Sequence, residues 1–67
     1  MNAPRTEIDA DISRAAQILD EVADDLRECH TVRGRWVILD ECDRNARAEH
    51  DENRRIARRL RRFVGSL

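Results

Sequence analysis

Four residues of the kinds that bind metals or act as nucleophiles lie in the middle of the chain: Cys29, His30, Cys42 and His50. Structural zinc takes four ligands, which usually come in closely spaced pairs. The one close pair here is Cys29 and His30, which are adjacent, and both cysteines stand at positions suited to small buried side chains. We therefore predict no metal site, no cofactor and no disulfide, and two cysteines fit a reducing compartment.

A second polar pair, Glu49 and Asn53, interrupts an otherwise apolar repeat. A polar residue at such a position fixes the register and oligomeric state of packed helices. Catalysis would need a glycine-rich phosphate loop or a nucleophile beside a histidine and an acid, and the sequence has neither. We predict that the pair sets register and that the protein is not an enzyme.

Arginines form the third candidate site, because the stretch RRIARRLRRF at residues 54–63 holds six of them on a chain without lysine. Residues 53–67 carry no acid, whereas residues 1–30 have a net charge of −5. The stretch either contacts phosphates or a partner protein, or is balanced by the acidic start of the chain. In the balanced arrangement of an antiparallel hairpin, the residues expected to approach one another are Glu7, Asp9 and Asp11 on one helix and Arg58, Arg59 and Arg62 on the other.

The spacing of the apolar residues indicates that these candidate residues lie on two helices. In the first half they repeat at alternating spacings of four and three, the pattern of a helix packed along a seam; they are Ile8, Ile12, Ala15, Leu19, Val22, Leu26 and Cys29. The second half continues the pattern at Leu39, Cys42, Ala46, Glu49, Asn53, Ile56, Leu60 and Phe63. Gly34 marks a tight connection. We predict one domain over residues 1–67, with helix one at about 6–30, a turn at about 30–35 and helix two at about 36–64.

The predicted fold is all-α, an antiparallel two-helix hairpin that dimerises into a four-helix bundle. A chain of 67 residues buries a small core and needs extra support. Each apolar stripe is also wider than its contact with one other helix, so two hairpins are needed to cover both stripes. The predicted dimer core is Ile8, Ile12, Leu19, Val22, Leu26, Ile56 and Leu60.

The stretch RWVIL at residues 35–39 contains the longest apolar run, four residues, which is far too short to span a bilayer. With no signal sequence evident at the start, we predict a cytoplasmic protein without membrane contact. On a helix this run would be apolar on all sides. Trp36 and Val37 then either close the end of the bundle or anchor another protein, since Trp and Arg dominate many interfaces.

This architecture resembles two groups of proteins. One is the plasmid copy-number RNA-binding proteins of the Rop type, which are helical hairpins of about this length that dimerise. The other is the very small early proteins of bacteriophages that inhibit host regulators, among them a quorum-sensing anti-activator. Both resemblances are architectural and carry over no functional residue.

From the residues and these resemblances we predict a phage- or mobile-element-type adaptor that binds a host protein, such as a transcription regulator, and inhibits it by occupying its surface. The predicted partner-binding residues are Trp36, Val37, Arg58, Arg59 and Arg62. The alternative is a Rop-like nucleic-acid-binding regulator that uses the arginine face of helix two.

Overall fold

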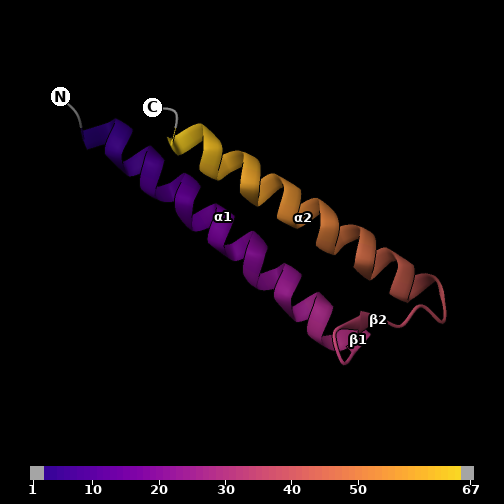
Figure 1. Cartoon of the computed structure of the whole chain (residues 1–67). Coiled ribbons are helices and arrows are strands. Elements are labelled where there is room, and N and C mark those ends of the chain that lie inside the picture. The colour runs from indigo at the N-terminus through magenta and orange to yellow at the C-terminus, as the bar shows by residue number, and fades with distance from the viewer. Residues whose placement is uncertain (1–2, 66–67) are drawn as a thin grey trace.

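A computed structural model describes the backbone of residues 3–65 and the side chains of residues 7–64. Two long helices, α1 (Ala3–His30) and α2 (Glu41–Gly65), run antiparallel and lie side by side along most of their length (Figure 1). The molecule is a rod of 53 × 19 × 15 Å. The predicted helical hairpin is confirmed, and α1 begins three residues before the start expected from the sequence.

The connection between the helices is a small β-hairpin of β1 (Thr31–Val32) and β2 (Arg35–Trp36). Its two central residues have positive φ, 54° for Arg33 and 79° for Gly34. Positive φ at both positions defines a type I′ turn, whose twist matches that of the flanking strands. The Val37 N–H donates to the His30 carbonyl oxygen at 3.0 Å and so continues the pairing toward α2.

Helix α2 begins at Glu41, five residues later than predicted. The cause is a reciprocal N-cap: Asp40 Oδ1 accepts a hydrogen bond from the Asp43 N–H at 2.9 Å, and Asp43 Oδ2 accepts one from the Leu39 N–H at 2.9 Å. Trp36 is held in β2, so RWVIL does not form the helical turn expected from its sequence.

Alanines allow the two helices to approach closely. The buried residues in the described part of the chain are Ala16 and Ala23 on α1 and Ala46 and Ala57 on α2. The larger apolar side chains at the edges of this contact, such as Leu19 and Leu60, are only half-buried. The hairpin therefore has a narrow seam of small residues and no enclosed core of large side chains.

Candidate functional site

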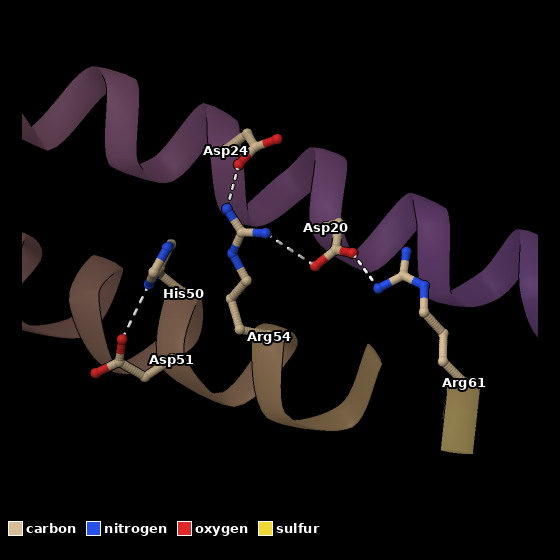
Figure 2. A network of polar contacts seen from close by, with 6 residues as sticks. All are labelled: Asp20, Asp24, His50, Asp51, Arg54 and Arg61. Carbon is tan, nitrogen blue, oxygen red and sulfur yellow. Dashed lines mark hydrogen bonds and ion pairs between the residues drawn. The ribbon is translucent and has the colours of Figure 1, made fainter. Parts of the chain in front are cut away.

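Ion pairs between the helices line one flank of the hairpin (Figure 2). Arg54 of α2 reaches across to Asp20 at 3.3 Å and to Asp24 at 2.5 Å on α1. Arg61 pairs with the other oxygen of Asp20. Asp20 is thus held between two guanidinium groups, and this flank contributes charge pairing that fixes the register of α1 against α2.

The arginines expected to pair with the acidic start of the chain do not do so. Arg58, Arg59 and Arg62 are exposed and make no ion pair with any described residue. A helix turns about 100° per residue, so these three side chains lie outside the seam, whereas Arg54 and Arg61 lie at its border. The outer face of α2 consequently presents three cationic groups that form no ion pair within the described part of the chain.

The opposite flank is apolar. On α1, the buried alanines separate Asp20 and Asp24 on one side from Ile8 and Val22 on the other. On α2 they separate the paired arginines from the apolar residues in the same way. We name this surface the apolar face; its residues are Ile8, Ile12, Leu19, Val22 and Leu26 of α1 and Ile56, Leu60 and Phe63 of α2. It contains all seven residues of the predicted dimer core.

Within one hairpin, the contact between α1 and α2 covers the side chains of this apolar face only in part. Phe63 is 54% exposed, Ile8 is 56% exposed and Val22 is 39% exposed, while the other members are half-buried. At the loop end the same side of the hairpin is hollowed by an open depression of about 460 Å³. Leu26 and His30 of α1 line it together with α2 residues between Glu41 and Glu49.

A polar contact joins the two helices at the loop end: His30 Nδ1 donates to Asp43 Oδ1 at 2.7 Å. The Thr31 hydroxyl, just after α1, donates to the Arg27 carbonyl oxygen of that helix at 2.6 Å. The hydrogen bond from the Leu39 N–H lowers the pKa of Asp43 below its ordinary value, with the His30 contact as the second cause. Asp43 therefore links the end of α1 to the start of α2 in its ionised form.

We expect acid to weaken this junction. Because the folded-state pKa of Asp43 is lowered, its contribution to stability is complete above the ordinary carboxyl pKa near 4 and is lost as the pH falls through the lower folded-state value. Asp43→Asn should lower the urea midpoint at pH 7 and flatten the fall in stability below about pH 5. Asp25→Asn is the control, since Asp25 is exposed on α1 and contacts no described histidine. Equal pH profiles for the Asp43 variant and the unchanged protein would contradict the assignment.

Trp36 packs against α2. Its ring meets that of His50 edge-on, with centroids 5.1 Å apart, and is half-buried, as is Val37. His50 Nδ1 donates to Asp51 at 2.9 Å, and its Nε2 is buried without a described partner. The role of Trp36 and Val37 in contacting a partner stays a prediction. From the sequence, His50 was a candidate only as a metal ligand. It lies four residues after Ala46 and seven before Ala57, a spacing that places it beside the alanine contact between the helices.

The loop end also exposes apolar side chains that the sequence had placed elsewhere. Leu39, expected in the seam of helix two, is 84% exposed and precedes α2. Val32 and Ile38 are exposed near it. Among the described residues, no three histidines, cysteines or acids gather as metal ligands would, and Cys29 and Cys42 are exposed free thiols.

No protein-family model matches this chain, and no curated protein or solved structure is significantly similar to it. The likeness to the Rop-type and phage proteins is shown only at the level of an antiparallel two-helix hairpin. Neither α1 nor α2, as described, has an apolar stretch long enough to cross a membrane.

Proposed function

We propose that this chain is a binding protein, not an enzyme, that dimerises through its apolar face into a four-helix bundle. The uncovered apolar face is the observation that carries this proposal. A hairpin whose buried residues are alanines gains little from burial, because each alanine removes little apolar area from water. A second copy would bury the larger side chains that one copy leaves exposed.

The total solvent-accessible area of one chain is consistent with a second copy on the apolar face. The chain exposes 5385 Å², whereas a compact monomer of 7.8 kDa exposes about 4,400 Å² by the usual mass scaling. The excess of about 1,000 Å² is similar to the roughly 800 Å² per subunit that a stable interface buries. Packing apolar face to apolar face would leave Arg58 and Arg62 outside the bundle.

The proposed role of the dimer is to occupy an acidic surface of a host protein, such as a transcription regulator, and to inhibit it by mass action. Arg58, Arg59 and Arg62 supply positive charge that no acid of the described chain neutralises, which favours fast encounter with an acidic partner. Trp36 and Val37, with exposed Leu39 beside them, supply apolar contact at the loop end.

The second candidate is nucleic-acid binding, which the same unpaired arginines favour. Direct titration separates the two functions. Under the protein-binding proposal, labelled generic RNA and DNA show no shift at micromolar protein and low salt. A salt-dependent shift that disappears on charge removal would replace the proposal by the Rop-like function.

Removing outer charges should weaken partner binding without disturbing the fold. We expect the double variant Arg58→Gln, Arg62→Gln to lose at least tenfold in affinity for a host protein that the unchanged chain retains from a bacterial lysate, mainly through slower association. Its helicity and mass should stay unchanged. The matched control removes two exposed charges of the other helix, at Arg14 and Arg27. Unchanged affinity in the double variant, or equal losses in both, would refute this role.

A further inference from the structure

We propose that two copies pack apolar face to apolar face with their loops at opposite ends, so that α2 of one copy lies antiparallel against α2 of the other. This arrangement rests on the proposed dimerisation and adds to it the orientation of the copies. The occupant of the apolar face is thus a second copy of this chain. Charge complementarity along one border of that face favours this orientation.

A single stripe of α2 carries both signs of charge, separated along its length. Glu49, Glu52, Ile56, Arg59 and Phe63 follow spacings of three and four, which places them on one side of the helix. Glu49 and Glu52 are exposed in the first part of the stripe, and Arg59 is exposed in the second. The stripe therefore runs from acidic to basic, with Ile56 near its centre.

Such a stripe complements itself only when the second copy runs the other way. If two α2 helices pair antiparallel about a centre near residue 54, Glu49 of one copy comes level with Arg59 of the other. Glu52 comes level with Ile56 and with the neighbouring exposed Arg55, which already contacts Glu52 of its own helix at 3.7 Å. Opposite charges that flank an apolar seam set the orientation and the choice of partner helix. Each pair adds little alone, but both occur twice in a symmetric dimer.

The opposite orientation, with both loops at one end, places α2 of each copy against α1 of the other. The acidic and basic parts of the α2 stripe then no longer face each other. The opposed-loop arrangement instead brings the end of α2, with Leu60, level with the hollow of the other copy, which Leu26 and Ala46 help to line. Apolar side chains then fill a depression that one copy leaves open.

The arrangement also brings the two proposed partner-binding regions closer along the bundle. Within one hairpin, Trp36 packs against His50, which lies about 18 Å along α2 from Arg62. With the loops opposed about a centre near residue 54, His50 of one copy comes level with Arg58 of the other.

Charge exchange tests the orientation. One variant carries Glu49→Arg and Glu52→Arg, and the other carries Arg55→Glu and Arg59→Glu. In the opposed-loop dimer each variant alone places like charges together, so self-association should weaken at least tenfold. An equimolar mixture should form a heterodimer at least tenfold tighter than either variant alone, because every pair between copies again has opposite signs, while the Glu52–Arg55 contact within each helix stays lost in both. A mixture no tighter than the separate variants would overturn the proposal.

Cross-linking provides a test with single surface substitutions. In a Cys29→Ser, Cys42→Ser background, Glu52→Cys lies near the proposed centre, and a short bis-maleimide should link two copies in high yield. The matched control is Asp51→Cys, which removes the same charge at the same level but lies on the outer side of α2. A dimer that cross-links equally at both positions, or at neither, would refute the orientation while leaving dimerisation intact. A monomeric protein would remove both.

Discussion

Val22→Asp should dissociate the dimer and abolish most of the helicity. Val22 is 39% exposed in a single hairpin, so a monomer could tolerate a carboxylate there with modest loss. In the proposed bundle the same position is covered by the second copy, where an unpaired charge costs several kcal/mol. That loss is comparable to the whole stability of a domain of this size, about 3–5 kcal/mol. Circular dichroism and sedimentation at tens of micromolar measure the two effects.

The control for this variant introduces the same carboxylate on the other side of α1. Ala10 is exposed and lies away from both α2 and the apolar face. Ala10→Asp should keep the mass and nearly all of the helicity, with a change within about 0.5 kcal/mol as is usual for surface substitutions. Equal behaviour of the two variants would mean that no second copy covers Val22.

Ala23→Leu should destabilise the hairpin by forcing α1 and α2 apart. Ala23 is fully buried at the seam, where the helices approach closely because the side chains are small. Added methyl groups at such a site typically cost about 1–3 kcal/mol through displaced backbone and strained rotamers. Urea unfolding followed by circular dichroism gives this value directly.

Ala10→Leu is the matched control, since Ala10 is exposed on α1 and leucine has nearly the same helix propensity as alanine. Its midpoint should match that of the unchanged protein. An Ala23 variant as stable as this control would show that the helices do not meet at the alanine seam.

The apolar spacing was sufficient to predict two helices, because a repeat of three and four residues matches the helical period, and Gly34 placed the turn between them. It could not predict the start of α2. The turn at Arg33 and Gly34 lacks the Asn-Gly or Asp-Gly pair that announces a type I′ turn, and an arginine at positive φ is uncommon. Leu39 fits the apolar spacing of helix two but does not belong to that helix. It lies in the irregular segment before the N-cap residue Asp40.

The arginines show a similar limit. Their crowding on α2 was evident in the sequence, but not which of them face α1. Arg54 and Arg61 are seven residues apart and so lie on the same border of the seam, where Asp20 and Asp24 meet them. The seven-residue spacing of these two arginines was visible in the sequence. Whether Asp20 and Asp24 lie opposite these arginines depends on the register of α1 against α2. The alanine contacts and the loop determine that register.

The central claim is that a second copy covers the apolar face, and the molar mass in solution tests it most directly. Light scattering at tens of micromolar, with helicity measured on the same sample, should give about twice the 7.8 kDa of one chain. The mass should fall toward one chain on dilution only together with the helicity. A mass near 7.8 kDa with full helicity would contradict the account, because the exposed apolar face would then need no second copy.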